Sequence, residues 1–291
     1  VPGGRAPYPS TVVMGVTTAM AAGVSRIVVC APPRPDGEIE AVVLAACRLA
    51  GAHTVYRMGG AQAIAALAYG TESVTPVDVI VGPGNLYVQE AKQQVFGQVG
   101  IDGFAGPSDL LAIADGEADA DLLAADLLAQ AEHGEATIVV ALSTHMPLLE
   151  ALADRLGTAP DTGAMARLVH VEDLAQALAV TQGFAPEHLQ LVGSAAEQLA
   201  PRCTHAGCVF VGESSATAFG DYIAGSNHVL PTGGAARFAS SLSPGHFRRR
   251  FTEVRIGGAA STLAAVAAPL ARAEGFEWHA RSMEARIRDN G

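Results

Sequence analysis

Short apolar runs alternate with amphipathic stretches along the first 115 residues of the chain. Runs rich in aliphatic and β-branched residues predict four buried strands, at 26–31, 54–58, 77–82 and 109–115. Apolar residues at helical spacing around them predict helices at about 11–22, 37–50, 60–69 and 85–98. Strands that alternate with helices at this rhythm are typical of βαβ units, so we expect a parallel sheet.

A second set of the same kind begins at residue 119. The pattern predicts a helix over 119–133, which Gly134 ends. Four more strands are predicted after it, at 136–142, 167–171, 189–193 and 208–212, with helices between them. These elements predict a second α/β unit with its own sheet, and they place the boundary between the two units near 115–118.

The character of the chain changes after residue 212. Segment 213–245 is rich in Gly, Ser, Asn and Pro, and long loops of this kind in compact domains are usually functional. The tail that follows holds predicted helices near 260–272 and 275–288 but few apolar residues, so we expect it to pack on a partner subunit. The predicted organisation has three parts: α/β domains at 1–116 and 117–243, and a helical tail at 244–291.

Composition narrows the class of protein. The chain has 291 residues, of which 49% are hydrophobic and 16% charged, and this excludes a disordered or fibrous protein. A net charge of −11 without a basic stripe argues against a nucleic-acid partner. Four cysteines without a C-x-x-C pair, no apolar run of membrane-spanning length and no recognisable signal peptide favour a reducing, cytoplasmic location. The start at Val1 rather than Met indicates an excised or incomplete chain.

Two polar residues stand at the carboxyl end of the predicted helix 119–133. Gln130 and His133 are three residues apart, so they share one face of that helix. Neutral imidazole is a good zinc ligand, and pairs with this spacing are common in metal sites. A histidine that only caps the end of the helix explains the same spacing, and both interpretations stay open on this evidence.

Two further stretches carry polar groups. Stretch 220–234 holds Asp221, Asn227 and His228 between glycines, a composition found both in ligand-binding loops and in ordinary hydrogen-bonded loops. The tail holds Glu274 and His279 on or near one helix, where they form either a functional pair or part of a solvated face.

The adjacent residues Glu187 and His188 stand between a proline and an apolar run. Histidine titrates near neutral pH, so the pair can supply a base and an acid. A single polar step ahead of a buried strand is the alternative interpretation.

Two glycine turns indicate a phosphorylated ligand. The dinucleotide fingerprint G-x-G-x-x-G is absent, but segments 58–67 (MGGAQAIAAL) and 81–88 (VGPGNLYV) each place glycines after a predicted strand and before a helix. Backbone N–H groups at such helix starts bind phosphates. Two of these turns in successive βα units favour a dinucleotide or another phosphorylated ligand.

Taken in order, these segments resemble the histidinol dehydrogenase family. The matching strings are VPGGRAPYPSTV (1–12), GGAQAIAALAYG (59–70), VGPGNLYVQEAK (81–92), AGPSDLLAIAD (105–115), DLLAQAEHG (126–134), APEHLQ (185–190) and GDYIAGSNHVLPT (220–232). The resemblance implies two incomplete Rossmann-like domains with parallel-sheet cores and a small helical tail. It also implies that an N-terminal part of the family fold, ahead of the string VPGG, is absent from this chain.

The resemblance further implies a reaction and its site. Members of the family oxidise L-histidinol to L-histidine through L-histidinal in two hydride transfers to NAD, as the last step of histidine biosynthesis. The implied acid–base pair is Glu187 and His188, and the implied NAD contacts are Tyr8, Gln62 and Asn85. One Zn²⁺ per subunit is implied, and its ligands are Gln130, His133, Asp221 and His279. The implied substrate contacts are Ser108, Gln130, His133, Glu187, His188, Asp221, His228, Glu274 and His279. The enzyme is implied to be a homodimer whose active site is shared, with His279 supplied by the tail of the other subunit.

Two alternatives to this function remain. One is a sister dehydrogenase that acts on another small alcohol, and the other is a non-catalytic binding protein on the same fold. The chain retains His228 and Glu274, which favours histidinol, and it has lost no implied catalytic or ligand residue, which disfavours a binding protein. It departs from the family at Asp109, where Glu is common, and over 240–256.

Overall fold

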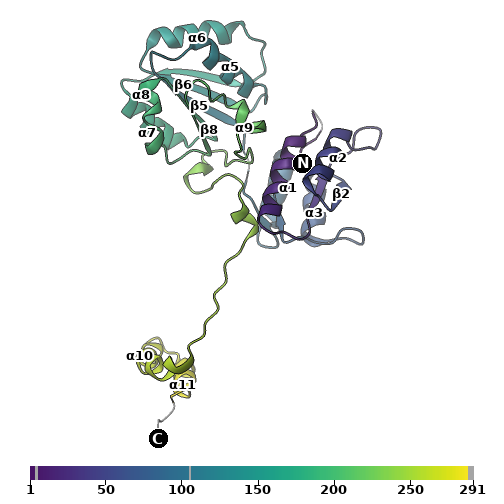
Figure 1. The fold of residues 1–291 in the computed structure, drawn as a ribbon, viewed down its shortest axis with the longest axis vertical. Coiled ribbons are helices and arrows are strands. Elements are labelled where there is room, and N and C mark those ends of the chain that lie inside the picture. The colour runs from purple at the N-terminus through teal and green to yellow at the C-terminus, as the bar shows by residue number, and fades with distance from the viewer. Residues whose placement is uncertain (4–5, 105, 288–291) are drawn as a thin grey trace. The chain divides into compact units, whose positions relative to one another are not determined.

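The computed structural model describes residues 1–3, 6–104 and 106–287. The chain divides into two compact units, Val1–Arg248 and Arg249–Gly291, which we describe separately (Figure 1). In these described ranges no helix is both long and apolar enough to cross a membrane.

The first part of the larger unit holds two small parallel sheets. Strand β1 (Val28–Ala31) pairs with β2 (Thr54–Arg57), and β3 (Val79–Ile80) pairs with β4 (Gly100–Ile101). Four helices accompany them: α1 (Pro9–Ala21), α2 (Ala41–Ala50), α3 (Gly60–Tyr69) and α4 (Leu86–Val95). Apolar stripes of α1 and α2 pack against one face of β1, while α3 and α4 form a second apolar cluster with β3.

The second part of the larger unit is built on one five-stranded parallel sheet. Its spatial order is β7-β6-β5-β8-β9, and every neighbouring pair is parallel. The strands are β5 (Asp109–Ala114), β6 (Ile138–Ser143), β7 (Met165–His170), β8 (His188–Val192) and β9 (Cys208–Val211). Counted along the chain, this order is 3-2-1-4-5, which is the order of a doubly wound fold.

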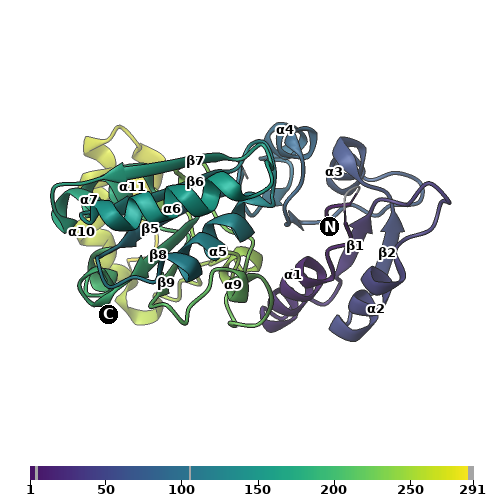
Figure 2. The ribbon, with the colours of Figure 1, turned by 90° about the horizontal axis from the view of Figure 1, so that it is seen from above.

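Helices cover both faces of this sheet (Figures 1 and 2). Helices α5 (Ala120–Ala131) and α6 (Met146–Thr158) share one apolar cluster with the sheet, and α7 (Leu174–Phe184) and α8 (Ser194–Glu197) share the other. All six residues of β5 are buried because helices lie above and below it. This explains why its sequence is a continuous apolar run and not an alternating one.

A short helix, η1 (Ala200–Arg202), lies between α8 and β9. Three further short elements close the larger unit after β9: α9 (Ala218–Tyr222), η2 (Ala235–Arg237) and η3 (Pro244–Phe247). The long segment after residue 212, which the sequence predicts to be a functional loop, therefore contains three short helices, α9, η2 and η3.

The α/β class with parallel sheets and flanking helices is confirmed, with one correction. The sequence places strand 109–115 in the first domain, but β5 lies in the second sheet, between β6 and β8. The boundary between the two groups of sheets therefore lies before residue 109, and not near 115–118 as predicted. An apolar run shows that a strand is buried on both faces, but it does not show which strands are its neighbours.

The smaller unit is a helical hairpin. After η4 (Gly257–Ala259), helix α10 (Ala260–Ala273) packs on α11 (Glu277–Glu284), close to the two predicted tail helices. A small core of Ala268, Ala271 and Ala280 holds them together, and Arg272 forms ion pairs with Glu277 and Glu284. Small alanine side chains allow close helix contact but bury little apolar area.

A buried ion pair shapes the turn between β3 and α4. The Lys92 side chain is 2% exposed and the Asp102 side chain 6%, and the two groups form an ion pair. Lys92 Nζ donates to the Gly82 carbonyl at 3.2 Å, and Gly82 N–H donates to Asp102 Oδ2 at 2.7 Å. Gly82 has a φ of 116°, which favours glycine. The pair therefore holds both backbone groups of the second glycine turn.

We predict that Lys92→Met lowers the free energy of unfolding by about 3–5 kcal/mol, because the Asp102 carboxylate then stays buried without its cation. Chemical denaturation measures this loss. The matched control is Lys92→Met combined with Asp102→Asn, which removes both charges and keeps an oxygen for Gly82 N–H. The double variant is expected to be more stable than the single one, and the reverse order would contradict the buried-charge explanation.

Candidate active site

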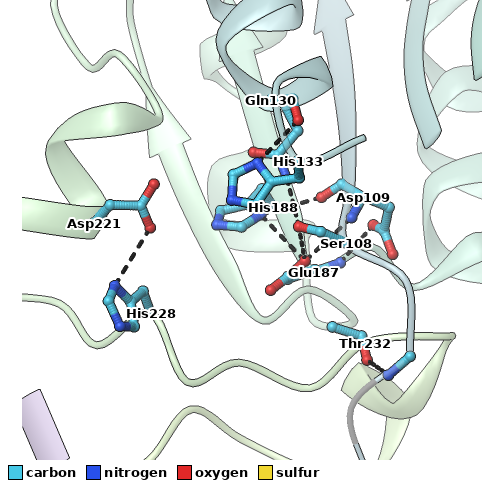
Figure 3. A network of polar contacts seen from close by, with 10 residues as sticks. Ser108, Asp109, Gln130, His133, Glu187, His188, Asp221, His228 and Thr232 are labelled. Atoms are coloured by element: carbon cyan, nitrogen blue, oxygen red, sulfur yellow. Dashed lines mark hydrogen bonds and ion pairs between the residues drawn. The ribbon is translucent and has the colours of Figure 1, made fainter. Parts of the chain in front are cut away.

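A cluster of polar side chains lies at the amino ends of β5 and β8 (Figure 3). Ser108 precedes β5 and Asp109 is its first residue, while Glu187 precedes β8 and His188 is its first residue. The register of the two strands pairs Leu110 with His188. Two polar steps that are far apart in the sequence therefore meet at one edge of the sheet.

Asp109 and Glu187 hold each other by reciprocal hydrogen bonds. Glu187 N–H donates to Asp109 Oδ1 at 2.7 Å, and Asp109 N–H donates to Glu187 Oε2 at 3.1 Å. Ser108 Oγ donates to the same Glu187 oxygen at 2.6 Å. Within the described ranges, Glu187 Oε1 has no recorded hydrogen bond, so one carboxylate oxygen is fixed and the other is available to a ligand.

Burial changes the acidity of both carboxyl groups. It raises the pKa of Glu187 to about 7, against the hydrogen bonds from Ser108 and Asp109, and the nearby Asp221 carboxylate raises it further. It also raises the pKa of Asp109 to about 7, against the hydrogen bond with the Glu187 backbone. At neutral pH each group can therefore give up or accept a proton.

His188 is arranged as a neutral base. Its Nδ1 lies 3.1 Å from the Asp109 carbonyl oxygen, so Nδ1–H donates to that oxygen and Nε2 keeps a lone pair. Its ring stacks on Phe210 with the ring centroids 6.0 Å apart. Burial lowers the pKa of His188, which favours the unprotonated imidazole at neutral pH. Glu187 Oε2 is 3.7 Å from the same Nδ1.

Two residues at the end of α5 reach the same place. Gln130 Nε2 donates to Ser108 Oγ at 2.5 Å, and His133 Nδ1 lies 3.0 Å from the Gln130 carbonyl oxygen. This backbone contact favours a proton on Nδ1 of His133, which leaves Nε2 as the atom that can bind a metal. Both residues contact the implied site, but His133 lies two residues beyond Ala131, the last residue of the helix.

The loop after β9 brings Asp221 and His228 to the cluster. Asp221 comes from α9 and points toward His133 and His188 (Figure 3). His228 Nδ1 is 3.7 Å from Asp221 Oδ1, and His228 Nε2 is 2.9 Å from Thr11 Oγ1 of helix α1. Burial lowers the pKa of His228, and the Asp221 carboxylate opposes that shift.

The remaining implied ligands lie in the smaller unit. Glu274 is the exposed residue that follows α10, and His279 is an exposed residue of α11 whose ring centroid is 5.0 Å from that of Phe276. Among the residues that the structure describes, no three His, Cys, Asp or Glu side chains form a metal-binding group. The four-residue zinc set therefore stays a prediction.

The three implied NAD contacts each lie at the start of a helix. Tyr8 immediately precedes α1, Gln62 is in the first turn of α3, and Asn85 precedes α4 and accepts a hydrogen bond from Val88 N–H at 3.1 Å. Helix starts offer unpaired N–H groups to anions. This location suits contacts with a phosphorylated cofactor, which stay a prediction.

Sequence reasoning missed four residues that shape the site. Asp109 hydrogen-bonds to both Glu187 and His188, and its only local signal is a carboxylate at the start of an apolar strand. Thr11 and Thr232 had no signal, because their partners, His228 and the backbone of Gly106, lie far away in the sequence. Ala185, which is fully buried, has a left-handed φ of 53° just before the pair and turns the chain from α7 into β8.

The doubly wound sheet and the buried Glu187–His188 pair together are typical of an α/β enzyme. The family model described as "Histidinol dehydrogenase" matches residues 1–287. The chain therefore belongs to the histidinol dehydrogenase family, and it is an oxidoreductase.

Individual relatives agree with this assignment. The histidinol dehydrogenase of Pseudomonas aeruginosa is 48% identical over 99% of this chain and 68% of its own length. That of Parasynechococcus marenigrum is also 48% identical over the same shares of the two chains. The crystal structure of histidinol dehydrogenase from Elizabethkingia anophelis superposes with a TM-score of 0.92 at 36% identity, over 99% of this chain and 69% of that one. The chain thus spans about two thirds of the length of these relatives.

We predict that Asp109→Asn flattens the pH dependence of stability. The folded chain holds the Asp109 proton up to about pH 7 and the unfolded chain only to about pH 4, so the free energy of unfolding falls as the pH rises through this window. The asparagine side chain keeps the oxygen that accepts from Glu187 N–H and does not titrate. Denaturation in the presence of a chelator should show the variant gaining about 1–4 kcal/mol over the unchanged chain between pH 5 and pH 8. A constant difference across that range would rule out a raised Asp109 pKa.

Proposed function

We propose that the protein oxidises L-histidinol to L-histidine through L-histidinal, with NAD as the hydride acceptor and a bound zinc ion. This would be the last step of histidine biosynthesis. The observation that carries the proposal is the buried Glu187–His188 pair, in which each side chain is fixed through one atom and has another atom free. The retained family residues around the pair support the same reaction.

His188 suits the role of base in both oxidations. Removal of hydride from an alcohol carbon requires loss of the hydroxyl proton, and an unprotonated imidazole can take it. The Asp109 carbonyl holds Nδ1–H and directs Nε2 away from the strand. Because burial lowers the pKa of His188, the base stays unprotonated at the pH of the cell.

Glu187 suits the activation of water. The aldehyde must add water before the second oxidation, and a carboxylate can remove a proton from that water. Ser108 and the Asp109 backbone fix Oε2, which leaves Oε1 as the contact atom. A pKa raised to about 7 makes this carboxylate a stronger base than an exposed one.

The donor chemistry of the site fits a metal ion. Gln130, His133 and Asp221 supply oxygen and nitrogen donors in this chain, and His279 from the tail of a second copy would complete the set. Mixed donors of this kind suit zinc without excluding manganese or cobalt. The ion would hold the imidazole and amine nitrogens of the substrate, and so its main contribution would be orientation.

Several polar side chains remain to bind the substrate. Ser108 and His228 lie at the site in the larger unit, and Glu274 would come from the tail. An amino alcohol with an imidazole ring offers donors that match these acceptors. The glycine turns and the helix starts at Tyr8, Gln62 and Asn85 would bind NAD.

A homodimer is the proposed assembly. The hairpin of the smaller unit exposes large apolar side chains, including Val266, Leu270 and Trp278. Such a surface needs a partner, and a second copy of the chain would bury it and bring His279 to a shared site. A cytoplasmic location stays a prediction.

We predict that the protein forms NADH from NAD and L-histidinol, and that a chelator abolishes this activity. The measurement is absorbance of NADH, with other small alcohols in parallel.

We also predict that His188→Ala lowers turnover roughly 10²–10⁴-fold with unchanged zinc content, because the base is then missing. The control is His205→Ala, a half-buried histidine whose Nδ1 lies 3.1 Å from the Gln182 carbonyl oxygen. Near-normal turnover by His188→Ala would remove that residue as the base, and a preference for another alcohol would favour the sister dehydrogenase.

We predict that His133→Ala loses zinc. The unchanged protein should retain about one zinc per chain after dialysis, and the variant well below one, because an imidazole ligand is missing. The control is His170→Ala, an exposed histidine at the opposite edge of the sheet. Equal zinc content in His133→Ala and His170→Ala would show that His133 is not a ligand.

A further inference from the structure

A buried polar pair lies directly behind the candidate site. Asp126 on α5 is 7% exposed and Gln190 on β8 is 1% exposed. Gln190 Nε2 donates a hydrogen bond to Asp126 Oδ2. Across the described residues, Gln190 Oε1 is the buried side-chain atom that has no hydrogen-bond partner.

A third segment joins this pair. The Thr217 backbone lies beside the Asp126 carboxylate and opposes the rise in the Asp126 pKa that burial causes. Thr217 is 3% exposed and immediately precedes α9. One carboxylate therefore links a helix, a strand and the start of a second helix.

Each of the three segments also carries a residue of the candidate site. That residue lies about one helical turn, or one strand repeat of two residues, away along the chain. Asp126 is four residues before Gln130 on α5, so both lie on one helix face. Thr217 is four residues before Asp221 at α9. Gln190 is two residues after His188 on β8, so both side chains lie on one face of the sheet. The three site residues therefore share a common anchor.

Core stability alone does not explain this arrangement. A buried carboxylate and an amide with an unpaired oxygen carry a desolvation cost that apolar side chains of similar volume avoid. Hydrogen bonds are directional, whereas apolar contacts allow neighbouring elements to slide. The polar pair thus fixes the relative placement of α5, β8 and α9 in a way that an apolar pair does not.

We propose that Asp126 is a positioning residue, which holds Gln130, His188 and Asp221 in register because it stands on α5, accepts a hydrogen bond from β8 and lies beside the start of α9. The inference rests on the proposed function for the roles of those three residues. It goes beyond that function because neither Asp126 nor Gln190 is among the residues proposed to bind the substrate or the metal. Their substitution should move the site residues apart without removing any of them.

The test compares Asp126→Ala with a control of similar structural cost. Leu152→Ala is that control. Leu152 is a fully buried residue of α6, and it lies in the apolar cluster that α6 shares with α5 and the sheet. Titration with Co²⁺ alone should show a loss of affinity of about 10–100-fold and a changed visible spectrum in Asp126→Ala. Leu152→Ala should change the affinity less than about threefold. Asp126→Asn, which keeps an oxygen at this position, should recover most of the lost affinity.

A second measurement does not depend on the metal. Diethyl pyrocarbonate modifies accessible imidazoles, and mass spectrometry gives the rate at each histidine. In the chelator-treated chain, the rate at buried His188 should rise about tenfold in Asp126→Ala and in Gln190→Leu. The rate at exposed His170 should not change, and Leu152→Ala should match the unchanged chain at both histidines.

The two measurements separate the inference from the proposed function. If the unchanged chain binds no Co²⁺, the metal part of the proposed function fails, and the His188 rate still decides the role of Asp126. If Asp126→Ala and Leu152→Ala give the same His188 rate and the same Co²⁺ affinity, Asp126 is an ordinary core residue and the inference is overturned.

Discussion

The pairing of β5 with β8 is the constraint on which the candidate site depends. The two strands are neighbours in the sheet, yet the bonds between Asp109 and Glu187 span 78 residues of sequence. The chain between them forms two crossover units, β6 and β7 with their helices, which lie on the other side of β5 from β8. The geometry of the Glu187–His188 pair therefore depends on the assembled sheet, and no isolated segment of the chain can reproduce it. The sheet also depends on the site, because the reciprocal hydrogen bonds between Asp109 and Glu187 fix the register of β5 against β8.

Local sequence patterns predicted where the strands lie better than they predicted which strands pair with each other. The runs at 54–58 and 208–212 became strands close to their predicted bounds, because β-branched and aromatic residues in a short run carry a strong local signal. The run at 77–82 gave only a two-residue strand, and β4 was not predicted, because its pairing depends on the turn that Lys92 and Asp102 hold. The partners of β5 were predicted wrongly for a related reason: a strand buried on both faces is apolar throughout, whatever sheet it joins.

The candidate site shows the same limit at the level of side chains. Glu187 and His188 could be singled out from the sequence, since charged residues beside an apolar run are uncommon, but only the family strings gave them roles. The support behind them could not be found in this way. Asp126 and Gln190 look like ordinary polar residues of a helix and a strand, and their burial follows from tertiary packing. The contact of Thr11 with His228 joins two halves of the larger unit, and no periodicity within either half encodes it.

The candidate site lies at the amino edge of the sheet, whereas ligands of doubly wound folds usually bind at the carboxyl edge. The helices run antiparallel to the strands, so their carboxyl ends lie at the amino ends of the strands. Helix α5 ends beside Gln130, and α7 ends just before Glu187. Helix carboxyl ends carry a partial negative charge from their macrodipoles. The helix carboxyl ends thus favour a cation at this edge independently of any charged side chain. A metal ion or a protonated amine has the required charge. The helix starts near Tyr8, Gln62 and Asn85 present the opposite polarity, which selects anions. Two ligands of opposite charge would therefore be sorted by the direction of the helices alone.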